Sequence, residues 1–337
     1  MSDGGEKPEV KGAGHESNGL EKSSPVAPHA SRLTPPSLSP TQRAWRRFLR
    51  NRPAVVSGAF LVAVLLVVLL WPALTRHHPD AVSDHQFWGP CLDYWFGTDV
   101  HGRDLLARVC YGARISLLVG AVGAGVSLVI GVLWGAVAGY LGGRWDSAMM
   151  RVVDVLYSLP SIVFVIVLIT ALEGWFRKWL SALVGLDTGP TARLIFLFVG
   201  LGAVSWLTMA RIVRGQVLSL RTRAFVEASR ALGASHAHIL LRHILPNVVG
   251  VVIVYLTLTV PAVILSESFL SYLGLGIQPP QASLGSLIAE GASQINPVRT
   301  YWWLIVLPGA TLALILLALN FLGDGLRDAF DPRSEGR

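Results

Sequence analysis

Six uninterrupted apolar segments constrain this chain more than any other feature of its sequence. Segments of about 20 apolar residues are long enough to cross roughly 30 Å of hydrocarbon as helices. Backbone groups in lipid must hydrogen bond within their own segment, so each segment is predicted to be helical. The sequence therefore predicts an all-α, polytopic membrane protein with six transmembrane helices. None of the six segments contains Asp, Glu, Lys or Arg, and they cover approximately Ala54–Leu74, Ile115–Leu141, Val155–Leu172, Leu194–Ala210, Val248–Ser266 and Tyr301–Leu322.

Composition agrees with a lipid environment. Of the 337 residues, 52% are hydrophobic and 15% are charged, whereas soluble domains carry about 25% charged residues. A net charge of +7 is also compatible with nucleic-acid binding. Nearly all Lys and Arg, however, lie in short runs between the apolar segments, which is how charge orients membrane proteins.

The charged runs predict an orientation. Five acidic and three basic residues occupy the loop over 75–111, whereas six arginines and one acid occupy the loop over 211–246. Positively charged loops stay in the cytoplasm. We therefore expect a multi-pass protein of the bacterial cytoplasmic (inner) membrane with both termini in the cytoplasm. The arginines on which this predicted orientation rests are Arg43, Arg46, Arg47, Arg50 and Arg52 before the first segment, and Arg211, Arg214, Arg221, Arg223, Arg230 and Arg242 in the loop over 211–246.

The chain divides into four regions. Residues 1–42 are rich in Ser, Pro, Gly and Glu and lack an apolar period, so we expect a disordered cytoplasmic tail. Residues 43–110 hold an N-terminal cytoplasmic segment, the first transmembrane helix and an outer loop. Residues 111–322 form a five-helix core that includes the cytoplasmic loop 211–246. Residues 323–337 form a cytoplasmic C-terminal tail.

The loop over 211–246 has a helical pattern with two sides. Gly233 interrupts the pattern, and because glycine adopts positive φ easily, it is predicted to divide two short helices. An amphipathic helix of this kind either lies on the membrane or docks into a groove of a partner, and its composition leaves both open. The apolar side holds Phe225, Ala228, Leu232 and Ile239, and the polar side holds Glu227, Arg230 and Arg242.

The same loop resembles the EAA loop of ABC importer permeases in residue types and in spacing. The matching residues are Glu227-Ala228-Ser229, then Gly233, then His243-Ile244-Leu245-Pro246-Asn247. Ser229 stands where the family usually has a second Ala, and its small side chain leaves a docking face intact. The resemblance implies a type I ABC importer permease fold. It also implies that a cytoplasmic ATPase subunit couples to this chain through Glu227, Ala228, Ser229, Gly233, His243, Pro246 and Asn247.

The stretch from Ser205-Trp206 through Arg211 and Arg214 to this loop is most similar to the C-type subunit of oligopeptide permeases. Further segments resemble peptide and nickel importer permeases. They are Gly97-Thr98-Asp99 with Gly102-Arg103-Asp104, Glu267–Ser271, and Asn320–Asp328 followed by Asp331-Pro332-Arg333. The resemblance implies a homologous B-type permease, two ABC ATPase subunits and an extracytoplasmic peptide-binding protein as partners, besides membrane lipids. The substrate class it implies is oligopeptides, with dipeptides, nickel chelates and glutathione-like molecules as alternatives.

Glu267 and Ser268 are candidates for a gate or a substrate pathway, because an ionisable residue at the end of a span is often functional. A carboxylate at the membrane interface without a function is the alternative. Asp99, Arg103 and Asp104 either form a structural ion pair or help to receive the binding protein.

Two further predictions concern an ion pair near a helix end and a helix face lined by glycine. Arg151 and Asp154, three residues apart, are expected to pair with each other. Gly131, Gly135 and Gly139 line one helix face and predict close packing against a helix that the sequence does not identify.

Other chemistry finds little support in the sequence. A P-loop needs a lysine directly after a glycine, and none of Lys7, Lys11, Lys22 and Lys178 follows one. We therefore expect no cofactor in this chain, with ATP and Mg²⁺ bound by the partner subunits, and no enzymatic activity. A secondary transporter would keep ionisable residues within its spans. The six apolar segments contain no Asp, Glu, Lys or Arg, so this class of protein is disfavoured. Cys91 and Cys110 are expected to be unpaired, with a disulfide as the alternative. His77, His78, His85, Asp80 and Asp84 are expected to lie in a solvated loop, and a metal site formed by them is the alternative.

Overall fold

The computed structural model describes residues 40–75, 78–184, 189–279 and 281–330. This part of the chain is helical, with one isolated β-bridge between Thr98 and Asp104. Five of its helices are long and apolar enough to cross a membrane, and a bent pair of helices provides a sixth candidate span. The five helices are α2 (Arg52–Leu74), α3 (Leu105–Leu141), α6 (Gly189–Leu220), α9 (Leu245–Tyr272) and α11 (Trp303–Phe330).

The third predicted span is not a straight helix. Helix α4 (Gly143–Tyr157) and helix α5 (Ser161–Val184) meet at an angle of 89°, so the predicted segment Val155–Leu172 contains a break. Pro160 lies at the break. Proline lacks an N–H donor and restricts the residue before it, which explains why the helix ends there. The length of the apolar run predicts that a span exists here but does not predict its bend.

Two helices extend beyond their apolar segments. Helix α3 starts at Leu105, where the Asp104 side chain accepts a hydrogen bond from the Leu106 N–H at 2.9 Å. Helix α6 continues to Leu220, so Arg211 and Arg214 lie on this helix and not in the predicted loop. Arginine has good helix propensity, and it ends the apolar run without ending the helix.

The first described helix lies partly within the predicted tail. Helix α1 (Pro40–Arg50) begins three residues before Arg43 and contacts α2 and α11. The Asn51 side chain accepts a hydrogen bond from the Ala54 N–H at 3.3 Å and caps α2. The rest of the predicted tail, residues 1–39, lies outside the described residues, as does the end of the C-terminal tail, residues 331–337.

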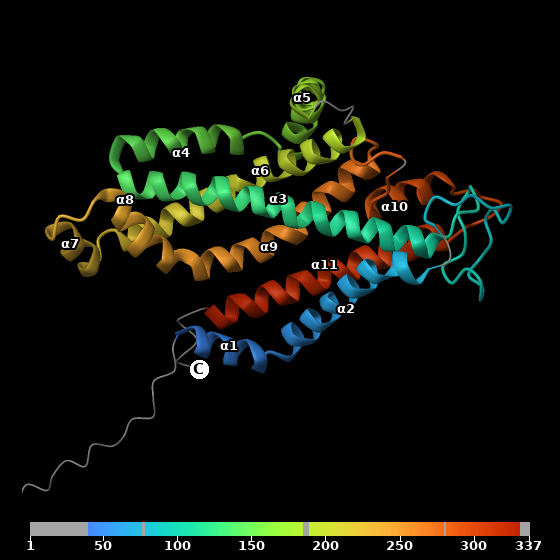
Figure 1. The fold of residues 1–337 in the computed structure, drawn as a ribbon, viewed down its shortest axis with the longest axis horizontal. Coiled ribbons are helices and arrows are strands. Elements are labelled where there is room, and N and C mark those ends of the chain that lie inside the picture. Colours follow the sequence, from blue (N-terminus) through green and yellow to red (C-terminus); the bar gives the residue numbers. More distant parts are fainter. Residues whose placement is uncertain (1–39, 76–77, 185–188, 280, 331–337) are drawn as a thin grey trace, which may run out of the picture. The chain divides into compact units, whose positions relative to one another are not determined.

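The glycine face of α3 packs against α6. A Cβ atom added to Gly131 would lie 2.6 Å from the Met209 Cβ, and one added to Gly135 would lie 2.3 Å from the Ala210 carbonyl oxygen. Neither position accepts a side chain without displacing α6. The predicted close packing is therefore confirmed, and α6 is the partner helix that the sequence left unidentified; the two run side by side in Figure 1.

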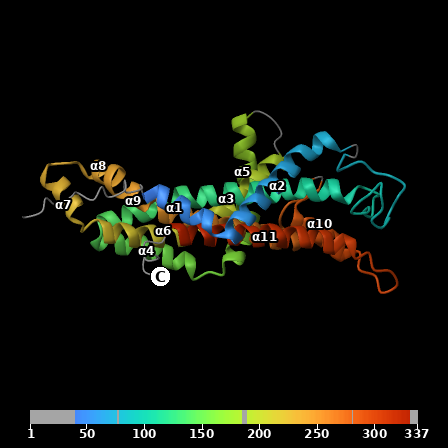
Figure 2. The same ribbon diagram turned by 90° about the horizontal axis from the view of Figure 1, so that it is seen from below.

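A short helix between α9 and α11 was not predicted. Helix α10 (Leu284–Ser293) starts at a capping box of Ser283 and Ser286 and packs against α9, α11 and α3. Both views place α10 at one end of the long helices and the loop between α6 and α9, with helices α7 and α8, at the other (Figure 1, Figure 2). We call these the α10 end and the α7 end.

Candidate coupling and gating sites

The loop between α6 and α9 forms two short helical segments. Helix α7 (Ala224–Ala231) is followed by Gly233 with φ of +81°, by helix α8 (His236–His238), and by one π-helical segment, Ile239–Ile244, that continues into α9. The predicted division at Gly233 is confirmed. A Cβ atom at Gly233 would meet nothing within 4 Å, so the positive φ alone favours glycine there.

One side of this loop is anchored in the protein. Val226, Ile239 and Ile244 are fully buried in a cluster with residues of α3, α6 and α9. The structure separates the residues that the apolar pattern grouped: Ile239 is buried in this cluster, whereas Phe225, Ala228 and Leu232 are exposed on the other side of the loop. Leu232 is 88% exposed. Val226, one residue after Phe225, takes the inward position, so α7 presents apolar side chains outward.

The coupling residues predicted from the EAA resemblance lie along this loop and the start of α9. Glu227 and Ala228 are exposed, and the half-buried Ser229 donates a hydrogen bond to the Phe225 carbonyl oxygen at 2.8 Å. At the far end, the Asn247 side chain donates to the His243 carbonyl oxygen at 2.6 Å. Pro246 lies in the first turn of α9, directly after the π-helical segment.

Glu267 is enclosed by hydroxyl groups at the α10 end. The side chain is fully buried and accepts hydrogen bonds from Ser271 on α9 at 2.6 Å and from Ser116 on α3 at 3.3 Å. Ser268 donates to the same carboxyl group at 3.4 Å. Ser116 also accepts a hydrogen bond from the Leu284 N–H of α10 at 3.3 Å. This serine cluster therefore joins α3, α9 and α10, and Glu267 is enclosed by protein in this structure.

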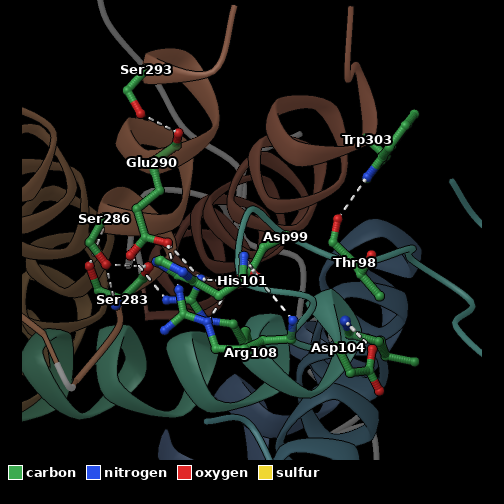
Figure 3. A network of polar contacts seen from close by, with 12 residues as sticks. Thr98, Asp99, His101, Asp104, Arg108, Ser283, Ser286, Glu290, Ser293 and Trp303 are labelled. Carbon is green, nitrogen blue, oxygen red and sulfur yellow. Dashed lines mark hydrogen bonds and ion pairs between the residues drawn. The ribbon is translucent and has the colours of Figure 1, made fainter. Parts of the chain in front are cut away.

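A second polar cluster lies nearby, around Arg108 on α3 (Figure 3). The guanidinium group of Arg108 donates to both carboxylate oxygens of Glu290 on α10, at 2.6 and 3.0 Å. It also donates to Asp99 in the outer loop at 2.8 Å, and Asp99 accepts from Arg103 at 2.7 Å. The two-pronged contact with Glu290 is the strong form of an arginine–carboxylate pair. The ion pairs connect the outer loop, α3 and α10.

This cluster confirms one predicted ion pair and adds members. Asp99 and Arg103 pair as the structural alternative proposed, and the Asp104 side chain caps α3. Glu290 was missed. Its sequence signal was a single acidic residue within the otherwise uncharged stretch 284–293, whose helical structure the sequence reading did not predict.

Two ion pairs at the ends of the spans differ from expectation. Asp154 pairs with Arg211 of α6 at 2.8 Å, so the predicted pairing with Arg151 is wrong. Asp146 at the start of α4 accepts two hydrogen bonds from Arg214 at 2.5 and 2.7 Å. Because α6 continues past Ala210, both arginines reach α4. The ion pairs therefore form between two helices and not between residues three apart on one helix.

A cavity of about 300 Å³ lies among α4, α5, α6 and α9. Its lining combines apolar side chains with hydroxyl groups, including those of Ser205, Thr208 and Ser266. Ser266 precedes Glu267 and points into this cavity, whereas Glu267 points into the serine cluster. The described residues contain no group of three His, Cys, Asp or Glu side chains arranged for a metal ion. Cys91 is exposed and Cys110 is buried, and both are free thiols.

Comparison with known proteins places this chain in one family. Residues 131–336 match the family described as binding-protein-dependent transport system inner membrane component, and residues 39–89 match the N-terminal TM domain of oligopeptide transport permease C. Oligopeptide transport system permease protein OppC of Escherichia coli (strain K12) is 48% identical over 296 residues, which cover 87% of this chain and 91% of the relative.

Two more relatives and one solved structure are informative. OppC of Salmonella typhimurium is 47% identical, covering 87% of this chain and 91% of the relative. Dipeptide transport system permease protein DppC of Bacillus subtilis (strain 168) is 43% identical, covering 88% and 87%. A chain of the inward-facing MetNI methionine ABC transporter has a TM-score of 0.49 at 21% identity, covering 67% of this chain and 97% of that chain. At that score the structural likeness adds no argument.

The sequence matches decide the assignment. They cover more than four-fifths of this chain and of each relative named, and the helical architecture agrees with several membrane spans. Membership in this family of ABC transporter components implies a binding protein and an ATPase as partners. This chain belongs to the binding-protein-dependent transport system inner membrane component family, as a multi-pass permease subunit of an ABC importer in the inner membrane.

Proposed function

We propose that this chain is the C-type permease subunit of an importer that carries oligopeptides across the cytoplasmic membrane. The observation that carries this proposal is the 48% identity to an oligopeptide permease over nearly the whole chain, together with the match of residues 39–89 to the N-terminal domain of such permeases. Dipeptides are the second candidate, because a dipeptide permease is 43% identical.

The coupling site is the loop between α6 and α9. Its inner side is anchored by Val226 and Ile239, while Phe225 and Leu232 are exposed on its outer side. A loop built in this way transmits force into α6 and α9 and offers an apolar surface to a partner. In this proposal, the residues that couple the chain to an ATPase subunit are Glu227, Ala228, Ser229, Gly233, His243, Pro246 and Asn247.

The proposed assembly contains a homologous B-type permease, two ABC ATPase subunits and an extracytoplasmic peptide-binding protein. ATP and Mg²⁺ bind to the ATPase subunits, and both termini of this chain lie in the cytoplasm. Closure of the two ATPase subunits moves the α6–α9 loop, and α6 and α9 tilt with it. Coupling of this kind is reciprocal, so loading of substrate changes the affinity for nucleotide by the same free energy.

The proposed gate lies at the serine cluster of Glu267 and Ser268. The cluster joins α9 to α3 and α10 through hydroxyl groups. A tilt of α9 that separates it from α3 would break the Ser116 contact and expose the carboxyl group to the pathway. Glu267 therefore holds the closed arrangement in this proposal, and its exposure would accompany opening.

The test is uptake by coupling-loop variants. We expect Glu227→Arg and Gly233→Pro to insert into the membrane normally and to abolish uptake of a labelled tripeptide, because each disrupts α7 or its docking surface. The measurement is uptake in cells that lack the chromosomal copy, with co-purification of the ATPase from the same membranes. Arg151→Gln, an exposed position on α4, is the control and should retain uptake. Normal uptake by both loop variants would refute the coupling assignment.

A further inference from the structure

A second cavity, of about 520 Å³, lies at the α10 end, between the end of α2 and the first turns of α3. Val68 and Trp71 of α2 form one wall, Tyr111 and Arg114 of α3 form another, and residues 78–80 of the outer loop contribute the rest. The end of α2 lies beside the start of α3 in Figure 1. This cavity shares no lining residue with the cavity among α4, α5, α6 and α9.

The lining of this second cavity crosses the boundary of the lipid. At this end, the apolar segments of α2 and α3 are bounded by Leu74 and Ile115. Val68 and Trp71 lie within the first segment, whereas Arg114 directly precedes the second. A tryptophan near the end of a span is typical of the level of lipid headgroups. The cavity therefore begins in the apolar layer and continues to the headgroups.

Two opposite charges line the cavity without pairing. Within the described part of the chain, the Arg114 guanidinium group and the Asp80 carboxylate form no ion pair or side-chain hydrogen bond, and both residues are exposed. The Asp80 N–H donates a hydrogen bond to the His78 Nδ1 atom at 3.3 Å, within a turn of the outer loop. One positive and one negative side chain thus line the same cavity. They suit a ligand that carries both signs of charge.

A buried donor belongs to the same lining. The Nε1 atom of Trp71 is buried and has no hydrogen-bond partner among the described residues. A buried donor without an acceptor destabilises a protein, and tryptophan at a membrane interface usually has one end in apolar surroundings and its N–H near polar groups. An acceptor oxygen that enters the cavity would satisfy this donor after a small rotation of the indole ring. This observation is independent of the two charges and also indicates a ligand.

An apolar stripe on α3 starts at Arg114 and continues into the membrane. Leu118 and Val122 follow Arg114 at every fourth residue, so the three side chains lie on one face of the helix. Both apolar side chains are exposed, by 44 and 41%. A molecule with its polar end beside Arg114 therefore has an apolar surface along which a hydrocarbon chain can lie.

We propose that this cavity binds the headgroup of a zwitterionic glycerophospholipid, of the phosphatidylethanolamine class, from the membrane leaflet at the α10 end. The phosphodiester lies beside Arg114 and accepts a hydrogen bond from Trp71. The ammonium group lies beside Asp80, and an acyl chain follows the stripe of α3. Arg114 adjoins an apolar segment whereas Asp80 lies in the outer loop, which matches the order of phosphate and ammonium groups along the headgroup. The lipid joins the ends of α2 and α3, and the proposal does not depend on the transported substrate.

Native mass spectrometry of the complete transporter in detergent tests the proposal, with dioleoyl phosphatidylethanolamine as the probe. The transporter should retain one such lipid in preference to dioleoyl phosphatidylglycerol, which has no ammonium group for Asp80. Arg114→Gln should weaken retention of phosphatidylethanolamine about 5-fold, the contribution of one arginine near a lipid phosphate. Asp80→Asn should remove the preference between the two lipids. Equal retention of both lipids by the unaltered transporter would overturn the proposal, and so would retention of neither, because a partner subunit would then cover the cavity.

Arg299→Gln and Asp93→Asn are the matched controls. Both residues are exposed at the α10 end, and neither lines the cavity. Each control removes the same charge as its counterpart and should retain the lipid as the unaltered transporter does. An equal loss in the controls would show that the general charge of this end holds the lipid, and it would overturn the site. Because Arg114 and Asp80 are exposed, their variants should also keep the denaturant midpoint of the unaltered protein in lipid-free detergent, which separates loss of lipid from loss of fold.

Two competitors separate the sources of binding. Dioleoylglycerol has the chains without the headgroup, and O-phosphoethanolamine has the headgroup charges without the chains. The proposal expects neither to displace phosphatidylethanolamine at equal concentration. Displacement by O-phosphoethanolamine would indicate a site for a water-soluble ligand, and displacement by dioleoylglycerol would indicate an apolar patch. Either result would overturn the lipid assignment.

A measurement on the unaltered protein locates the acyl chain. Phosphatidylethanolamine with a photoreactive group in its acyl chain should cross-link to Leu118 and Val122 more than to Leu66 and Leu70 of α2, which are each 52% exposed. Equal labelling of the two helices would contradict a specific site. The readout is lipid binding, so it stands or fails separately from peptide uptake and ATPase co-purification.

Discussion

The two ends of the permease are built differently. At the α10 end, ion pairs around Arg108 and hydroxyl contacts around Glu267 connect α3, α9, α10 and the outer loop, and their central side chains are buried. At the α7 end, three buried aliphatic side chains anchor a short loop whose outer face is open. Leu232 on that face is 88% exposed, whereas Leu284 at the α10 end is fully buried.

The difference separates two mechanical tasks. Buried polar groups with specific partners stabilise one arrangement, and leaving it, as in the proposed opening at Glu267, costs free energy because a charge or hydroxyl group is left unpaired. An apolar anchor with few directional contacts permits small movements, and an exposed apolar surface requires a partner. Substitutions at the α10 end are therefore expected to lower the free energy of unfolding most. Substitutions on the outer face of the α7 end are expected to impair transport more than folding.

Removal of the Arg108 side chain should have the largest effect on stability. Arg108→Ala leaves the nearly buried Asp99 carboxylate without its partner from α3, and breaking a buried ion pair costs about 3 to 5 kcal/mol. We expect a loss of about 3 kcal/mol in the free energy of unfolding, measured by denaturant titration in detergent. Arg114→Ala, at an exposed position on the same helix, is the control and should change it by less than about 0.5 kcal/mol. Equal effects would remove the distinction for the α10 end.

Two glycines, one from each end, should give a smaller contrast. A Cβ atom at Gly285 would lie 2.4 Å from the Ser268 Cα, so Gly285→Ala should cost about 2 to 3 kcal/mol by overpacking. At Gly233 the Cβ meets nothing within 4 Å, and Gly233→Ala should cost about 1 kcal/mol from its positive φ. Unfolding titrations of both variants measure the difference. A larger cost at Gly233 would reverse the comparison.

The smallest stability effect is expected for an exposed residue of α7. Leu232→Ser removes an apolar side chain that is 88% exposed, and such surface changes are usually within about 0.5 kcal/mol. The same variant should lose ATPase in co-purification, because the outer face of α7 is its proposed docking surface. Leu284→Ser, at a fully buried position, should instead fail to fold or lose several kcal/mol. Intact ATPase binding by Leu232→Ser would place the docking surface elsewhere.

Much of the fold followed from the sequence, with particular exceptions. Five of the six predicted spans are single helices, and they and the division at Gly233 could be predicted because length, hydropathy and a single flexible residue are local properties. The bend at Pro160 and the continuation of α6 past Ala210 were missed, since charge and hydropathy report the lipid boundary and not the end of a helix. The inward residue of α7 is Val226, which the sequence pattern did not single out, because α3, α6 and α9 together decide which face is covered.

The sites divide in the same way. The coupling residues were located from the resemblance to the EAA loop, whose residues lie close together along the chain, and their docking role stays a prediction. Glu290 and Arg108 are 182 positions apart, and Asp154 pairs with Arg211 over 57 positions, so no local pattern identifies either pair.

The sequence by itself determined that this chain crosses a membrane and where its loops lie along the chain, because lipid forbids charges and unpaired backbone groups inside a span. The family resemblance came from motif residues that lie close together in the sequence. The tertiary structure alone decided that the glycine face of α3 meets α6, that α10 closes over Arg108, and that Glu267 is enclosed by serines. These contacts join residues far apart in the chain, and only the packing of helices against one another brings such residues within hydrogen-bonding distance.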